Sequence, residues 1–273
     1  MLVAHFVAPV RWVENWLADL RIVQYSPLIQ ATQSEVVLIT FTDETLDKLP
    51  YRHPIDRAFL SEVLHHIDES QPKVMGVTLE LDRPTEPYKD EELKRTLLNL
   101  QSRIFFVWKN QPEAQNNGWA LAGNDAGSGN RTPHAPKPLS PAQASFMDNL
   151  IPPSLRAHIG LHTGPFDDVV REVVEEPSVS GHSMVYALTG QPAPVHQWLP
   201  WYRQLRGSVE PPFTRYPAHL VFEAPLGWLT GKIVLIGTDL PQADRYPTPL
   251  SAGLAKRPTA PWWKFWPRPP RHG

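Results

Sequence analysis

The chain has 273 residues, 41% of them hydrophobic, and a formal net charge of -2. This length suffices for one large domain or two small ones. Because there is no cysteine, disulfides, thiolate metal sites and a cysteine nucleophile are excluded. The near-neutral charge supplies no broad basic field, so a nucleic-acid partner is not expected. No apolar run reaches the roughly 18 to 20 residues that span a bilayer.

The first half of the chain alternates between predicted helices and strands. Apolar residues at helical spacing predict an amphipathic helix over residues 10–23, and similar patterns predict helices starting at Pro54 and over residues 89–100. Nearly continuous apolar runs predict buried strands at residues 35–41, 73–81 and 103–108. This order implies parallel strands joined by right-handed crossovers.

The second half is less regular. Residues 110–141 are polar and rich in glycine and proline, which predicts a flexible insert. A short helix is expected at 142–149 and another at 180–188, ended by Gly190. Further strands are expected at 158–162, 169–174, 198–205, 218–223 and 231–237. The predicted fold class is α/β: a mixed, largely parallel central sheet with flanking helices, plus a long irregular insert.

Familiar enzyme signatures are absent from the sequence. There is no G-x-S-x-G and no G-x-G-x-x-G, and Gly231-Lys232 precedes a predicted strand where a phosphate-binding loop would follow one. His65 and His66 are adjacent on a predicted helix, so they point in different directions and do not form a metal-binding pair. No catalytic residue, metal ligand or cofactor is therefore expected.

The best candidates for binding are acids and arginines at the ends of predicted strands or the starts of predicted helices. They are Asp43, Arg57, Asp82, Arg83, Asp239 and Asp244. Parallel strands would bring such groups to one edge of the sheet, where α/β proteins commonly bind small ligands. The same residues could instead form salt bridges and helix caps that order the loops without any ligand. Both interpretations stay open from the sequence.

Six segments resemble, in the same order, the CHASE2 family of bacterial extracytoplasmic sensory domains. They are residues 14–22 with Asp19 and Arg21, 36–46, 53–67 with Pro54 and Arg57, 72–97, 165–173 with Arg171, and 229–251 with Asp244, Thr248 and Pro249. Two positions depart from the family pattern, because Thr42 and Thr78 stand where the family commonly has aspartate. This weakens the expectation of a cation or ammonium site between these strands.

The resemblance implies a sensory domain over residues 14–251, the remnant of a membrane-proximal segment at 1–13, and an irregular tail rich in proline, tryptophan and arginine at 252–273. It implies a non-catalytic input domain on the periplasmic or extracytoplasmic side of a membrane receptor with a nucleotide cyclase or kinase output. The expected partner is an unidentified small molecule or protein, with a homodimer as a further candidate. Membrane association would run through segments missing from this chain.

Two alternatives remain beside this expectation. The chain could be a degenerate or frameshifted receptor fragment without activity, because its anchor is short and its tail has an unusual composition. It could also be a hydrolase with an acidic site at the sheet edge, although no nucleophile–base pair supports that reaction.

Overall fold

The computed structural model describes residues 3–29, 32–108, 140–159, 161–163, 169–174, 182–191, 196–199, 201–203, 211–240 and 247–254. Nearly all of the expected insert at 110–141 lies outside these residues. Asp244 and the part of the tail after residue 254 also lie outside them.

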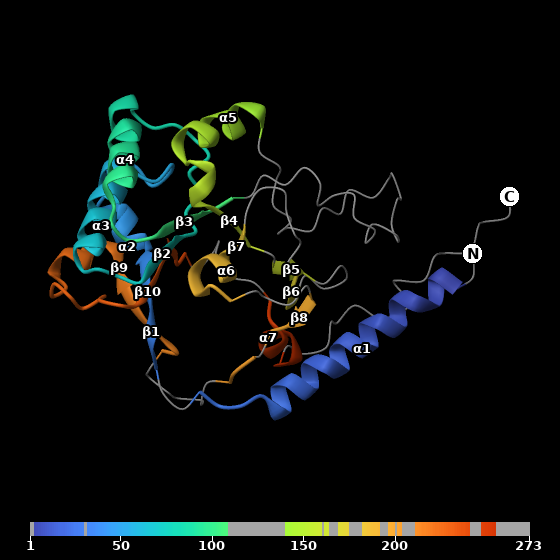
Figure 1. The fold of residues 1–273 in the computed structure, drawn as a ribbon. Helices are drawn as coiled ribbons and strands as arrows, with labels where there is room; N and C mark the ends of the chain where they lie inside the picture. Colours follow the sequence, from blue (N-terminus) through green and yellow to red (C-terminus); the bar gives the residue numbers. More distant parts are fainter. Residues whose placement is uncertain are drawn as a thin grey trace, which may run out of the picture.

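The centre of the described fold is a parallel sheet of seven strands (Figure 1). Its order is β7-β4-β3-β2-β10-β1-β9, and every neighbouring pair is parallel. This confirms the prediction of an α/β fold with a largely parallel sheet. The strands are β1 (Gln33–Phe41), β2 (Val74–Val77), β3 (Ile104–Val107), β4 (Arg156–His158), β7 (His182–Ser183), β9 (Phe213–Pro217) and β10 (Ile233–Thr238).

Strand β10, from late in the chain, lies between β1 and β2. Val234 pairs with Val37 on one side and with Met75 on the other. All three side chains are almost fully buried, as expected for a central strand in a parallel sheet. Because β10 lies between β1 and β2, the carboxyl ends of these three strands lie side by side.

Helices cover both faces of this sheet, and the alternation of side chains along each strand separates two apolar clusters. Met75 and Val77 of β2 join the larger cluster, whereas Val74 joins the smaller one. The larger cluster lies under α2 (Asp43–Asp47), α3 (Arg57–Glu69), α4 (Pro87–Asn99), α5 (Pro141–Leu150) and the 3-10 helix η2 (Ala218–Glu223), while α6 (Met184–Thr189) covers the smaller one.

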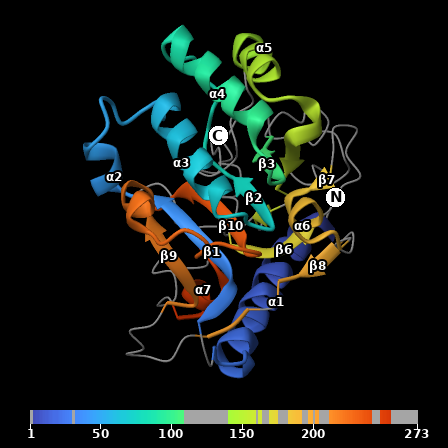
Figure 2. The same cartoon turned by 60° about the vertical axis from the view of Figure 1, so that its left-hand side comes forward.

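A second, antiparallel sheet has the order β5-β6-β8. Two terminal helices lie beside it and contact each other extensively, as Figures 1 and 2 show. Figure 1 shows α1 as a long rod whose N-terminal half extends beyond the other described elements. The elements are β5 (Leu161–Thr163), β6 (Val170–Val174), β8 (His196–Trp198), α1 (Val3–Tyr25) and α7 (Pro249–Leu254); a short 3-10 turn, η1 (Pro153–Leu155), precedes β4.

Several predicted elements differ from the structure. The expected strand at 218–223 is wrong: this segment is η2, in which Ala218 and Val221 are buried three residues apart, a 3-10 spacing. The expected strand at 158–162 divides into β4 and β5, which belong to different sheets. In the segment 198–205, strand β8 ends at Trp198, and Arg203 forms an isolated parallel bridge to Leu28; residues 200, 204 and 205 lie outside the described residues.

Some predicted boundaries also move. The helix expected from Pro54 begins at Arg57, because Asp56 has extended backbone and caps the amides of Ala58 and Phe59. The strand expected over 73–81 ends at Val77. The helix expected over 180–188 begins at Met184 and ends before Gly190, whose φ of 72° fits the predicted glycine stop.

Among the described residues, none of the helices is both long and apolar enough to span a membrane.

Candidate functional site

The carboxyl edge of the large sheet is held together by backbone contacts between three strand ends. The Asp239 amide donates to the Phe41 carbonyl at 3.1 Å, which joins β10 to β1. The amide and hydroxyl of Thr78 both donate to the Ile236 carbonyl, at 2.8 and 3.2 Å, which joins β2 to β10. A Cβ at Gly237 would overlap Thr78 Oγ1, so glycine is required for this close approach.

The two threonines that depart from the family pattern have local partners in this structure. Thr42 is the N-cap of α2 and accepts from the Thr45 amide at 3.3 Å. The Thr78 hydroxyl donates to the Ile236 carbonyl of the neighbouring strand β10. Both hydroxyls therefore order the edge of the sheet.

Arg57 lies beneath the loop that follows β2, and its side chain is 0% exposed. Its guanidinium donates to the carbonyls of Ile55 and Arg83, at 2.7 and 2.8 Å. Its Nε lies 3.7 Å from Asp90 Oδ1. Burial lowers the pKa of Arg57, and the nearby Asp90 carboxylate opposes that effect. Arg57 therefore stays charged and orders the loop from below.

Asp90 holds the same loop from the helix side. Its carboxylate accepts from the Thr85 amide at 3.1 Å and from the Thr85 hydroxyl at 2.8 Å. Together, Arg57 and Asp90 attach the loop at the Arg83 carbonyl and at Thr85. Arg57 and Asp90, which lie beside the predicted binding edge, therefore support the loop that follows β2.

A second buried ion pair joins the starts of α3 and α4. Lys89 Nζ lies 2.6 Å from Asp56 Oδ2 and also contacts the Tyr51 hydroxyl and Glu86 Oε1, each at 3.3 Å. The hydrogen bond to Asp56 raises the pKa of Lys89. Burial pushes the pKa of Asp56 up, but bonds from Lys89 and two backbone amides outweigh it, so the net pKa is lowered. The pair is therefore ionised over a wide pH range.

Tyr51 completes this group by donating to Glu86 Oε2 at 2.8 Å. Burial raises the pKa of its hydroxyl, and the hydrogen bond to Glu86 adds to that rise. We call the set that orders this corner of the sheet the edge network; its members are Tyr51, Asp56, Arg57, Asp82, Thr85, Glu86, Lys89 and Asp90.

Two members of the edge network have unused bonding capacity among the described residues: Arg57, whose buried Nε has no hydrogen-bond partner, and Asp82. The Asp82 Oδ2 accepts from Gln143 Nε2 of α5 at 2.6 Å. Its Oδ1 is buried and has no hydrogen-bond partner among the described residues. Buried polar atoms in proteins are nearly always satisfied, so this oxygen is a marked exception.

The other predicted site residues lie apart from this network. Asp43 pairs with Arg52 on the exposed side of α2, and Asp239 pairs with Arg215 at 3.3 Å. The Arg83 side chain is exposed, and only its carbonyl joins the network. Arg57, Asp82 and Arg83 therefore lie together, whereas Asp43 and Asp239 occupy separate positions on the same edge; Asp244 lies outside the described residues.

A second buried polar contact lies far from this edge, at α1. Arg171 of β6 donates from Nε to Asp19 Oδ1 at 2.9 Å and from a terminal nitrogen to Oδ2 at 2.7 Å. Asp19 is 2% exposed and Arg171 is 5% exposed. Such a two-point bond fixes orientation as well as distance.

The neighbouring contacts attach both terminal helices to the small sheet. The Val170 amide donates to the Pro247 carbonyl at 3.0 Å, and Thr248 Oγ1 accepts from the Ser251 amide at 3.3 Å at the start of α7. Since α7 packs along α1, motif residues from both ends of the chain converge here. We call Asp19, Arg171, Thr248 and Pro249 the α1 joint.

The C-terminal end of α1 is also fixed by a side chain from the second half of the chain. Arg203 donates to the carbonyls of Val23 and Ser26, at 2.9 and 2.8 Å. A cation at the last carbonyls of a helix also complements the helix dipole.

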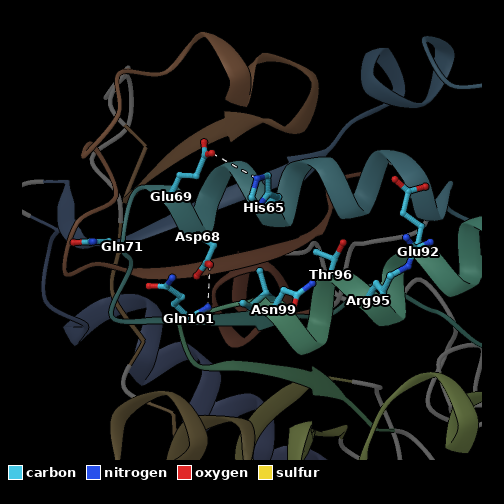
Figure 3. Close-up of a pocket in the computed structure, with 10 residues that line it drawn as sticks. His65, Asp68, Glu69, Gln71, Glu92, Arg95, Thr96, Asn99 and Gln101 are labelled. Carbon is cyan, nitrogen blue, oxygen red and sulfur yellow. Dashed lines mark hydrogen bonds and ion pairs between the residues drawn. The ribbon is translucent and has the colours of Figure 1, made fainter.

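A cavity of about 580 Å³ lies at the opposite, amino edge of the large sheet (Figure 3). It opens between the C-terminal ends of α3 and α4. Asp68 from its wall accepts from the amides of Gln101 and Ser102, at 3.0 and 2.8 Å. Burial tends to raise the pKa of Asp68, but these bonds outweigh it and lower the pKa. Asp68 thus ties α3 to the start of β3.

Sequence reasoning missed Tyr51, Lys89 and Asp90 as members of the network. A signal was present, because a lysine and an aspartate stand together in the first turn of α4, on the side that packs against α3. No group of three or more potential metal ligands gathers within the part of the chain that the structure describes.

These residues are positioned by an open α/β sheet. The first and last described helices, α1 and α7, pack against each other beside it. The chain matches the model of the CHASE2 domain over residues 1–262 and belongs to the CHASE2 family. This is a family of extracytoplasmic sensory domains found in signalling proteins. No curated protein and no solved structure matches the chain.

Proposed function

We propose that this domain is the input module of a membrane signalling receptor of the nucleotide cyclase or kinase type. It senses a small molecule or a protein on the extracytoplasmic side and catalyses no reaction itself. The family membership supports a sensory role, and the geometry supports a particular route for the signal.

The observation that carries this proposal is the α1 joint. The first and last described helices lie side by side, and each is bonded to the small sheet, α1 through Asp19 and α7 through the Pro247 carbonyl. A shift of the small sheet would therefore move both helices together. Rigid helices that change position with a bound partner are a common means of passing a signal.

Asp82 is the group at the carboxyl edge best suited to contact a ligand. Its buried Oδ1 lacks a hydrogen-bond partner among the described residues, so a ligand donor would satisfy it. The second carboxylate oxygen is fixed by Gln143, which holds the free oxygen in one orientation. A ligand carrying an ammonium, amide or hydroxyl donor fits this acceptor best.

A thermal-shift screen tests the sensory role. The purified chain is heated with amino acids, amines, sugars, nucleotides and divalent cations. A ligand of the native state must raise the melting temperature, and we expect at least one class to do so. Asp82→Asn should reduce that shift, whereas Glu91→Gln, at an exposed position on α4, should leave it unchanged.

One of two results would narrow the proposal, and the other would overturn it. If none of these classes shifts the melting temperature, the small-molecule role falls and a protein-binding or scaffold role replaces it. If the purified chain shows turnover that Asp82→Ala abolishes, the domain is an enzyme instead.

A further inference from the structure

The cavity at the amino edge of the large sheet is an open groove of about 580 Å³ with a polar lining. It lies between the C-terminal ends of α3 and α4 (Figure 3), whereas Asp82 lies at the carboxyl edge. Ligand sites in proteins commonly have volumes of about 300–1,000 Å³, so the groove has room for a small organic molecule. We call this space the amino-edge groove.

Carboxylates dominate the charge of the amino-edge groove. Among the described residues that line it are three acids, Asp68 and Glu69 of α3 and Glu92 of α4, and one guanidinium, that of Arg95. Burial tends to raise the pKa of Asp68, but its hydrogen bonds outweigh this and lower the pKa, so this carboxylate is charged at neutral pH. The lining therefore has a net negative charge.

The two helices that form the walls add to this negative field. Helix α3 ends at Glu69 and α4 ends at Asn99, so both C-terminal ends lie at the groove. The C-terminal end of a helix carries a partial negative charge, which a nearby cation complements. Helix α4, which the structure describes in full, has no basic residue in its last turn. The groove therefore favours a cationic ligand over an anionic one.

The spacing of the carboxylates favours an extended ligand. Figure 3 shows Asp68 and Glu69 toward one end of the groove and Glu92 toward the other, with Thr96 and Asn99 between them. Nowhere among the described residues do three or more potential metal ligands converge, so these acids do not close around one inorganic ion. A linear molecule with separated ammonium groups can reach both ends, and the hydroxyl and amide between the ends can bond to it.

We propose that the amino-edge groove binds a linear diamine or polyamine, whose ammonium groups pair with Glu69 of α3 and Glu92 of α4. A ligand that pairs with both helices would hold their C-terminal ends together. The groove and Asp82 lie at opposite edges of the sheet, and this inference does not depend on the ligand-sensing role proposed for Asp82.

Isothermal titration of the full chain with spermidine, in about 0.15 M salt, tests the proposal. We expect spermidine to bind at least about fivefold more tightly than butylamine, which has one ammonium group and can pair at only one end. Glu69→Gln and Glu92→Gln should each weaken spermidine binding by about two- to fivefold, the range for a solvent-exposed ion pair.

Three further variants separate this site from a general attraction between a cation and an acidic surface. Arg95→Gln should strengthen spermidine binding by about twofold, because it removes a like charge from the lining. Glu62→Gln on α3 and Glu91→Gln on α4 are the matched controls, since both residues are exposed and lie outside the lining. Both controls should keep the affinity of the wild type, because charges beyond about 8 Å are screened in this salt.

Equal affinity for spermidine and butylamine, or no binding of spermidine, would overturn the proposal. Weaker binding in Arg95→Gln would also contradict it, because the groove would then prefer an anion. If Asp82→Asn removes spermidine binding while Glu69→Gln and Glu92→Gln do not, the amine binds at the carboxyl edge. That result would overturn the assignment to the groove and leave the sensory role of Asp82 standing.

Discussion

The edge network and the α1 joint both bury an ion pair, but they connect very different parts of the chain. Lys89 and Asp56 approach to 2.6 Å, are 33 residues apart, and join two helices on the same face of one sheet. Arg171 and Asp19 approach to 2.7 Å, are 152 residues apart, and join a terminal helix to another sheet.

The two regions also differ in what they hold together. In the edge network, loop, strand and helix ends share several mutually bonded groups within one sheet and its helices. At the α1 joint, the Asp19–Arg171 pair holds a terminal helix against a separate, small sheet. A buried network inside a sheet stabilises the fold globally, whereas a terminal helix can detach at a local cost. We therefore expect stability at the edge and movement at α1.

The largest effect should come from Arg57→Met. This change leaves Asp90 buried without its cation, and the Arg83 carbonyl loses its donor. Breaking a buried charge pair typically costs about 3–5 kcal/mol of unfolding free energy. Urea unfolding of the two proteins gives the difference. Arg83→Met, at an exposed side chain, is the control and should change stability by less than about 0.5 kcal/mol.

Lys89→Met should cost about 2 kcal/mol at neutral pH, because a buried charged hydrogen bond is lost. Asp56 has a lowered pKa, so its contribution is present above the ordinary value of about 3.9 and is lost as pH falls through its folded value. Lys89 has a raised pKa, so its contribution is present below about 10.4 and is lost as pH rises through its folded value.

The difference between Lys89→Met and the wild type should therefore be largest between about pH 5 and pH 9. Urea midpoints measured across that range, and on both sides of it, check this. Lys94→Met on the same helix provides the matched control, because Lys94 only approaches Glu91 at 3.9 Å. A difference that does not vary with pH would contradict the ionised pair.

Gly237→Ala should have a smaller effect, about 1–2 kcal/mol, because the new Cβ would overlap Thr78 Oγ1. The second substitution Thr78→Ala removes that overlap, so it should cost less in the Gly237→Ala background than in the wild type. Thermal unfolding of the four proteins measures this coupling. Costs that simply add would show that the two strand ends are not in contact.

The sequence predicted the parallel sheet well, because long apolar runs identify buried strands without knowledge of their partners. It did not predict that β10 separates β1 from β2, since apolar pattern carries no information on strand order. It also missed η2, where a short apolar run after Pro217 fits a strand and a helix equally.

The candidate site was predicted in part for a similar reason. Asp82 and Asp239 follow predicted strands in the sequence. Because parallel strands end at the same edge of a sheet, the sequence indicated that both residues lie at that edge. The partners of these residues depend on how the helices pack, which local sequence does not specify. Asp19 and Arg171 were each noted in separate motifs, but their pairing joins elements 152 residues apart and appears only in the fold.

Hydrogen exchange in Asp19→Ala tests the central claim, that the α1 joint can open while the sheet stays intact. We expect the amides of α1 to exchange much faster than in the wild type, while β1, β2 and β10 keep their protection and the unfolding free energy of the sheet changes by less than about 1 kcal/mol. Arg21→Ala, exposed on the same helix, should change neither. Equal loss of protection in α1 and in the central strands would contradict the account, because the joint would then be one more part of a single cooperative core.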